Sequence, residues 1–172
     1  MQKIICPTML LHPDAKAPAR SKDRAMGHDI CCVAGVKFLQ TPETWSDEQR
    51  RDWRAMEARG YVVIHPGQSF LFRTGFAQAI QEGYACMLWD RSGLGAMKLV
   101  GRLAGVIDED FRGEWFVRLV NHSPVAVTIR VGEKIVQGVY QERIVADCQI
   151  VTELDVTERG TAGFGSTDKP VQ

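Results

Sequence analysis

Three carboxylates lie close together near the middle of the chain, in the segment Ile107-Asp108-Glu109-Asp110-Phe111. An apolar run, residues 103–107, leads into them, and Arg112-Gly113 follows. Carboxylates at a turn can bind a metal ion, hold a water molecule or orient a nucleophile. The same residue types are also common at solvated turns for backbone reasons alone. The segment by itself therefore leaves open both a catalytic site and an ordinary hairpin tip.

Other segments carry residues that suit a nucleoside phosphate. Arg91-Ser92-Gly93 can present a guanidinium, a hydroxyl and backbone amides to phosphate oxygens. Gln137 can donate to a further phosphoryl oxygen, and Arg159 can engage a terminal phosphate. Phe164 lies between glycines and can close over the flat face of a base. Taken singly, each residue can equally belong to an ordinary turn, strand or tail.

Five segments in order resemble the five ordered motifs of the trimeric deoxyuridine triphosphatases (dUTPases). The resemblance runs from about Pro18 to Thr167, which is nearly the whole chain. It depends on the order of the motifs more than on any one of them. The segments are Gly27-His28-Asp29-Ile30, residues 91–95, residues 103–113, residues 132–137 and residues 159–167.

The resemblance implies an all-β, dUTPase-like jelly roll (β-clip) that assembles as a homotrimer with active sites at the subunit interfaces. It implies hydrolysis of dUTP to dUMP and pyrophosphate, which limits uracil in DNA and supplies dUMP for thymidylate synthesis. Water attacks the α-phosphorus with the help of Mg²⁺. The three phosphates would hold most of the Mg²⁺ coordination sphere, which suits an ion that keeps several waters.

The resemblance also assigns roles to single residues. Asp108 matches the carboxylate that orients the attacking water, and Asp29 matches the one that contacts the water shell of Mg²⁺. The phosphate-binding positions are Arg91, Ser92, Gly93, Gln137, Arg159 and Ser166. The nucleoside-binding positions are Gly105, Val106, Ile107, Phe111, Phe164 and Gly165. The C-terminal arm is expected to cross to a neighbouring subunit and close over the nucleotide.

The chain departs from the family pattern at three places that bear on selectivity. In the family a β-hairpin, here about residues 99–107, presents backbone groups that match uracil, and Arg102 lies inside it. Asp90 stands where proline is common, and its carboxylate could pair with Arg91 or lower the local positive potential. Phe111 replaces a tyrosine, which keeps the ring under the deoxyribose and removes the phenol hydroxyl.

The elements that must position these residues are predicted to be short strands with Gly and Pro at the turns. One helix is predicted at 46–59, because Ser46 and Gln49 have capping-box form and Gly60 follows. We expect a β domain at 1–157 with a helical insertion at 40–60, and a flexible arm at 158–172. The predicted strands are 2–11, 30–33, 61–64, 68–73, 75–80, 83–89, 98–107, 114–121, 124–131 and 134–144.

Composition restricts the possible partners and setting. Lys plus Arg and Asp plus Glu both total 21, so the absence of a basic excess argues against a nucleic-acid partner. The five cysteines form no CxxC pair, which favours a reduced, cytoplasmic protein (or the host cytoplasm for a viral version) and gives no zinc-ligand spacing. No apolar run is long enough to span a membrane, so no membrane partner is expected.

Two other functions remain open from the sequence. A dCTP deaminase-like enzyme shares the fold, but it places a glutamate where this chain has Arg118, between Val117 and Leu119. A deaminase without that carboxylate lacks its general base. The other alternative is a non-catalytic nucleotide-binding regulatory protein, with helix 46–59 as a docking surface for an unknown protein.

Overall fold

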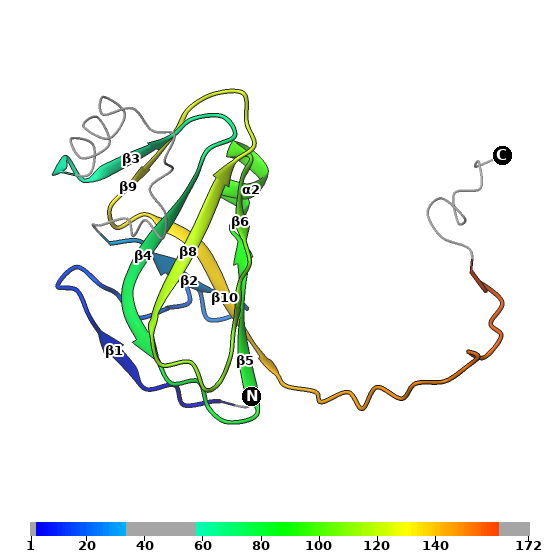
Figure 1. The fold of residues 1–172 in the computed structure, drawn as a ribbon. Coiled ribbons are helices and arrows are strands. Elements are labelled where there is room, and N and C mark those ends of the chain that lie inside the picture. Colours follow the sequence, from blue (N-terminus) through cyan, green and yellow to red (C-terminus); the bar gives the residue numbers. More distant parts are fainter. Residues whose placement is uncertain (1–2, 34–57, 162–172) are drawn as a thin grey trace.

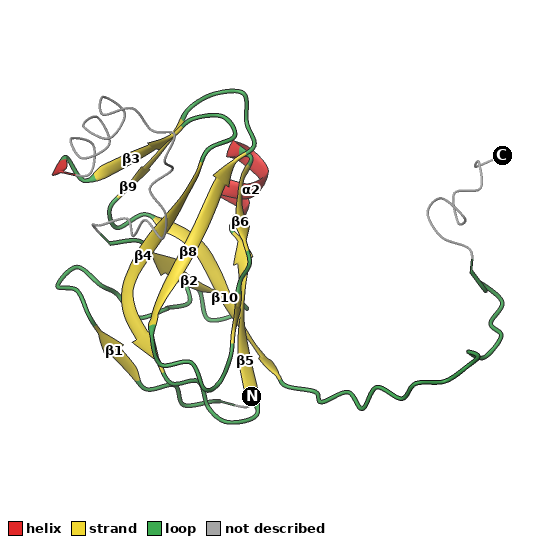
Figure 2. Cartoon of the chain, viewed as in Figure 1, coloured by secondary structure: helices red, strands yellow, loops and turns green. Residues whose placement is uncertain are grey.

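The computed structural model describes residues 3–33 and 58–161 of the chain. Two four-stranded sheets form the two layers of the body, and a separate two-stranded ribbon lies at one end (Figure 1). Strands predominate over helix throughout the described part (Figure 2). The predicted all-β class is therefore confirmed. Residues 46–57 of the predicted helix 46–59, and residues 40–45 of the expected insertion 40–60, lie outside the described residues.

All strand pairs of the body are antiparallel. The first sheet has the order β1 (Thr8–Leu10), β4 (Ser69–Gln78), β8 (Glu114–Asn121), β6 (Val100–Leu103). The second has the order β2 (His28–Cys31), β10 (Lys134–Glu142), β5 (Tyr84–Asp90), β7 (Val106–Ile107). The ribbon pairs β3 (Tyr61–Ile64) with β9 (Val127–Arg130).

The core lies between the two sheets. Along β8, the residues Trp115, Val117 and Leu119 are buried and alternate with half-buried neighbours, as expected for a strand with one face on the core. The Trp115 ring lies 5.0 Å from the ring of Phe76 on β4. Ile30 on β2 and Val136 on β10 close the core from the second sheet and have no exposed surface.

Two predicted strands, 68–73 and 75–80, are one strand in the structure. β4 runs from Ser69 to Gln78, and its register with β8 shifts between Arg73 and Ala77. Gly75 lies in this irregular part with φ of +72°, and a Cβ there would meet Ala15 at 2.9 Å. The glycine therefore marks a bulge within a strand rather than a break between two.

The predicted strand 98–107 is divided in the structure into two short strands, β6 and β7, and these do not pair as the hairpin predicted at about 99–107. Residues Ser92–Lys98 form a helix, α2, that sequence analysis had missed, and Leu99 ends it in the left-handed region with φ of 53°. β6 then pairs with β8 in the first sheet, whereas β7 pairs with β5 in the second. The chain therefore crosses from one sheet to the other at Ala104-Gly105 instead of folding back on itself.

Beyond β10 the described chain leaves the body. Residues 143–161 contain no strand or helix and run away from both sheets in Figure 1. Three apolar residues of this arm, Ile150, Leu154 and Val156, are more than four-fifths exposed. The domain division at residue 157 remains a prediction. Within the described ranges, no helix has the length and apolar character needed to cross a membrane.

Asn121, at the end of β8, is predicted to be essential for stability. Its side chain has no exposed surface and takes part in four hydrogen bonds, with Ile64, Val125 and twice with Ser123. Asn121→Ala removes all four of these hydrogen bonds from the buried end of β8, so we expect a loss of about 2–4 kcal/mol in the free energy of unfolding by urea. The exposed Lys16→Ala serves as a control, and equal stability of both variants would contradict the assignment.

Candidate functional site

Three predicted site residues come together on the outer face of the second sheet. Gln137 on β10 is directly opposite Asp29 on β2, and on its other side it faces Trp89 on β5. Residues opposite each other in a sheet point to the same face. Arg91 follows the end of β5 and therefore lies beside this row. We call Asp29, Arg91 and Gln137 the anion cluster.

Asp29 is the centre of the anion cluster and is held by two cations. Its Oδ1 accepts a hydrogen bond from Nε of Arg91 at 2.8 Å, and its Oδ2 pairs with Nζ of Lys134 at 2.7 Å. The carboxylate is only 11% exposed. Burial opposes its ionisation, but the hydrogen bonds and charges of Lys134 and Arg91 outweigh burial and lower the pKa of Asp29.

Gln137 is positioned from both sides. Its Nε2 donates to the carbonyl oxygen of Asp90 at 2.9 Å. On the other side, Gly27 leaves room for it, because a Cβ at Gly27 would lie 2.2 Å from Oε1 of Gln137. This close approach explains why glycine stands two residues before Asp29 in the first motif.

A cavity of about 610 Å³ opens beside the anion cluster. Arg91, Ser92 and Gln137 line it together with Arg102 and His122. Ser92 and Gly93 form the first turn of α2, where backbone N–H groups have no partner within a helix. Leu94 is buried and anchors this helix to the core. The cavity can therefore offer cations, a hydroxyl and backbone donors to an anion.

The predicted nucleoside segment lies at the other edge of the second sheet. Leu88 donates its N–H to the carbonyl of Gly105 at 2.7 Å, which ties the segment to β5. Val106 is 58% exposed and Ile107 is half-buried. The ring of Phe111 packs over Gly113, where a Cβ would lie 2.7 Å from its Cζ. Gly105, Val106, Ile107 and Phe111 are thus neighbours along one edge.

The three carboxylates of this segment differ in their contacts. Glu109 accepts a hydrogen bond from the N–H of Gly83 and pairs with Arg143 at 3.2 Å. It therefore fastens the turn to the chain on both sides. Asp108 and Asp110 are exposed, and no ion pair or side-chain hydrogen bond engages them within the described residues. Asp108 is therefore available to a ligand or a water molecule.

Within a single chain, Asp108 lies far from the anion cluster. Ile107 on β7 pairs with Cys86 on β5, which places Asp108 beside Ala85. Asp29 on β2 lies in the same row across the sheet as Gln137 and Trp89, and β2 is three strands from β7. Strand spacing and rise give a separation on the order of 20 Å. Arg159 is exposed and belongs to the arm, residues 143–161, which runs away from both sheets (Figure 1). Phe164, Gly165 and Ser166 lie outside the described residues.

Two ion contacts differ from the sequence interpretation. Asp90 does not pair with Arg91, because the guanidinium of Arg91 donates to Asp29 instead. The Asp90 carboxylate accepts a hydrogen bond from the backbone N–H of Arg102 at 2.9 Å. Lys134, which lies within the fourth motif (residues 132–137) and has no role predicted from sequence, pairs with Asp29. No signal in the sequence links it to Asp29, since the contact depends on the register of β2 and β10.

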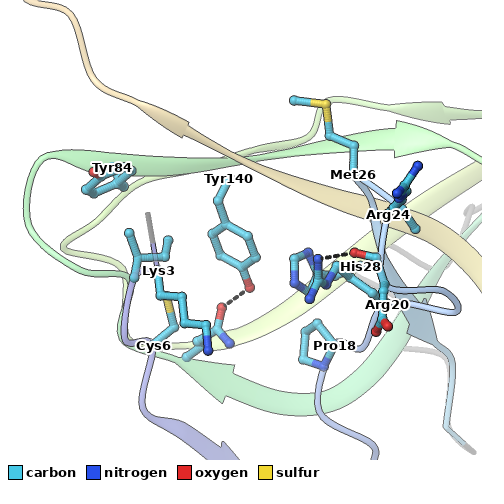
Figure 3. Close-up of a pocket in the computed structure, with 13 residues that line it drawn as sticks. Lys3, Cys6, Pro18, Arg20, Arg24, Met26, His28, Tyr84 and Tyr140 are labelled. Atoms are coloured by element: carbon cyan, nitrogen blue, oxygen red, sulfur yellow. Dashed lines mark hydrogen bonds between the residues drawn. The ribbon is translucent and has the colours of Figure 1, made fainter. Parts of the chain in front are cut away.

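A second cavity, of about 660 Å³, lies next to the predicted residues but contains none of them. Figure 3 shows His28 and Tyr140 facing into it, with Cys6 and Lys3 on the N-terminal segment. The Tyr140 hydroxyl donates to Oε1 of Gln78, and burial raises the pKa of Tyr140. These inward-facing residues alternate with the outward-facing Asp29 and Gln137. The predicted residues Asp29 and Gln137 therefore lie on the outer face of the second sheet and not in this cavity.

Comparison with known proteins identifies a family. The family model described as dUTPase matches residues 56–168. The deoxyuridine 5'-triphosphate nucleotidohydrolase of Wolinella succinogenes is 34% identical over 172 residues, covering 98% of this chain and 97% of that protein. The protein of the same name from Nautilia profundicola is 42% identical over 127 residues, covering 68% of this chain and 89% of its own.

Solved structures support the fold independently. A mutant dUTPase of Staphylococcus bacteriophage 80alpha with dUpNHpp superposes with a TM-score of 0.71 at 22% identity, covering 94% of this chain and 97% of that one. A mutant dUTPase of phage phi11 of S. aureus, described with a structural Mg(II) ion, has a TM-score of 0.63 at 19% identity and covers 87% and 97%. The dUTPase-like jelly roll is therefore confirmed.

The lowered pKa of Asp29 predicts a specific dependence of stability on pH. Its ionised form is favoured in the folded state, so its contribution is complete above the unfolded pKa of about 3.9 and is lost as pH falls through the lower folded value. We expect the melting temperature of the wild type to fall more steeply below about pH 4 than that of Asp29→Asn. Asp14→Asn, on an exposed loop, is the control. Parallel curves for wild type and Asp29→Asn would contradict this role.

Proposed function

This chain belongs to the dUTPase family, and on that premise we propose that it is a dUTP diphosphatase, which hydrolyses dUTP to dUMP and pyrophosphate. The relative from Wolinella succinogenes, similar over almost the full length of both chains, supports this reaction. The observation that carries the proposal in the structure is the anion cluster beside a cavity of about 610 Å³. That volume is within the range of small-molecule sites.

We infer that a complete site needs more than one copy of the chain. The anion cluster and Asp108 are on the order of 20 Å apart within one chain, too far for both to touch one α-phosphate. A homotrimer with sites at its interfaces resolves this separation, as the family resemblance implies. The exposed apolar residues of the arm, such as Ile150 and Leu154, support its packing on a neighbouring subunit.

In the proposed site, each residue has a separate task. Arg91, Ser92 and Gln137 bind phosphate oxygens, with Gly93 allowing close approach of the backbone. Asp108 accepts a hydrogen bond from water and orients it for attack on the α-phosphorus, which accounts for its lack of other partners among the described residues. Pyrophosphate then leaves, and dUMP remains.

The nucleoside end of the site is formed by backbone and ring groups. Gly105, Val106 and Ile107 supply the backbone that reads uracil, and the Phe111 ring packs under the deoxyribose. The arm closes over the nucleotide from another subunit. Its ligand-binding residues are Arg159, Phe164, Gly165 and Ser166. Closure of this kind excludes water other than the nucleophile.

The residues present fit a magnesium ion that is held mainly by substrate. No group of three or more His, Cys, Asp or Glu side chains gathers at one point in the described parts of the chain. Asp29 keeps its carboxylate ionised beside Arg91 and Lys134, so it can accept hydrogen bonds from water bound to the ion. When bound to the triphosphate, Mg²⁺ offsets the negative charge of the phosphates and of the leaving pyrophosphate.

The two alternatives are less well supported. In β8, Arg118 occupies the position where a deaminase would carry its glutamate, and it donates to the hydroxyl of Ser69 at 3.1 Å. A non-catalytic regulatory protein would not need the available Asp108.

A reducing, cytoplasmic setting is supported by the cysteines, all five of which are free thiols.

Product analysis with pure protein, Mg²⁺ and dUTP, dCTP, dTTP or UTP tests the proposed reaction. We expect pyrophosphate and dUMP from dUTP, with little turnover of the other nucleotides. Asp108→Asn should lower kcat by about 10²–10⁴-fold and leave dUTP binding nearly unchanged, because the amide keeps the shape but is a poor acceptor for the attacking water. Ammonia from dCTP, or near-normal kcat in Asp108→Asn, would contradict the assignment.

Removal of the arm tests its catalytic role separately. A chain ending at Thr157 lacks Arg159 and the whole Gly-rich segment, so we expect kcat/KM for dUTP to fall on the order of 100-fold. The melting temperature should change little, since no strand or helix of the body is removed. A truncated chain with wild-type kinetics would show that the arm has no part in the reaction.

A further inference from the structure

Asp90 connects the two sheets next to the anion cluster. It is the last residue of β5 in the second sheet, and its Oδ1 accepts the N–H of Arg102 on β6 in the first sheet at 2.9 Å. Among the described strands β6 pairs only with β8 and is the edge strand of its sheet, so this N–H is open to a side chain. The carbonyl of the same Asp90 holds Gln137. One residue therefore touches both the anion cluster and the strand leading to the nucleoside segment.

Glycines on two sides make room for the Asp90 side chain. A Cβ at Gly95 on α2 would lie 3.1 Å from Cβ of Asp90, and one at Gly101 on β6 would lie 3.8 Å from its Oδ2. The first contact is tighter than ordinary van der Waals packing, so a larger residue at position 95 would displace Asp90. The carboxylate thus occupies a defined place between the helix and the strand.

Arg102 continues this connection into the nucleoside segment. Its Nη1 donates to the carbonyl of Ala104, and its guanidinium lies 5.4 Å from the centre of the Trp89 ring. A Cβ at Gly105 would be 3.0 Å from Nη1, so the guanidinium packs directly on that glycine. Arg102 therefore braces the point at which the chain crosses between the sheets.

The braced turn is in a conformation that needs support. Ala104 has φ of +65°, in the left-handed region that is unfavourable for a residue with a Cβ, and Gly105 has φ of +138°. Such conformations persist only where surrounding contacts hold them. Here the contacts are the Arg102 bond to the Ala104 carbonyl and the bond from Leu88 N–H to the Gly105 carbonyl.

We propose that Arg102, held by Asp90, is a positioning residue that fixes the Ala104-Gly105 turn and thereby the backbone at Val106 and Ile107 that selects the base. This inference rests on the proposed dUTP hydrolysis and adds a specificity-determining pair to it. The Asp90–Arg102 contact also connects the phosphate-binding group and the nucleoside-binding group of one chain. In an assembly with shared sites, these two groups belong to two different active sites.

Substitutions that remove the contacts one at a time test the proposal. Arg102→Met keeps an unbranched apolar stem and removes the guanidinium, whereas Arg102→Lys keeps the charge without the fork. Asp90→Ala removes the acceptor for the Arg102 N–H, and Asp90→Asn retains one. Arg118→Met is the matched control, because Arg118 is a half-buried arginine on the neighbouring strand with one side-chain hydrogen bond, to Ser69.

The measurements are kcat and KM for dUTP and for dCTP, with amide hydrogen exchange of residues 100–107. For Arg102→Met we expect KM for dUTP to rise about tenfold and the ratio of kcat/KM for dUTP over dCTP to fall about tenfold, with kcat changed by less than about twofold. Exchange should be faster across 100–107 in Arg102→Met and Asp90→Ala. Asp90→Asn and Arg118→Met should resemble the wild type, and Arg102→Lys should be intermediate.

The outcomes separate this inference from the proposed function. A wild type that does not hydrolyse dUTP overturns both. A wild type that selects dUTP, together with an Arg102→Met variant of unchanged KM and selectivity, overturns the positioning role alone. Equal losses of kcat with both nucleotides and no change in their ratio would also overturn it, because they would indicate a general effect on folding rather than on base selection.

Discussion

The ionic contact of Asp29 with Arg91 and Lys134 is the interaction on which the anion cluster depends. It joins β2, β10 and the segment after β5, three pieces of chain that are distant in sequence. A carboxylate that is only 11% exposed is costly unless cations and donors compensate for its lost hydration. Here both carboxylate oxygens of Asp29 have a cationic partner. The same negative charge therefore holds Arg91 in place and would accept hydrogen bonds from the water shell of a metal ion.

The two-layer architecture then determines where chemistry can occur. Residues that point inward along β2 and β10 build the core and the cavity of Figure 3, and those that point outward, such as Asp29 and Gln137, lie on the outer face of the sheet. Asp108 directly follows β7, the far edge strand of the same sheet. A rigid sheet cannot fold to bring these edges together, so the separation itself favours sites shared between subunits.

Backbone strain in the described chain concentrates near the predicted site. The two non-glycine residues with positive φ, among those described, are Leu99 and Ala104, which lie just before and just after β6. Both occur where the chain changes direction between α2, the first sheet and the second. Strained conformations are frequent where a protein must present its backbone to a ligand, and here Ala104 directly precedes Gly105, Val106 and Ile107, the segment expected to read the base.

The sequence by itself determined the family, through the order of five motifs, and strands such as 61–64 and 114–121, because alternation and turn residues are local signals. It predicted Asp29, Arg91 and Gln137 as one group only through that resemblance. The division of residues 98–107 between α2 and two sheets, the Asp29–Lys134 pair and the Asp90–Arg102 bond were decided by tertiary structure. Each depends on strand register and sheet membership, which contacts between distant residues establish and no local pattern encodes.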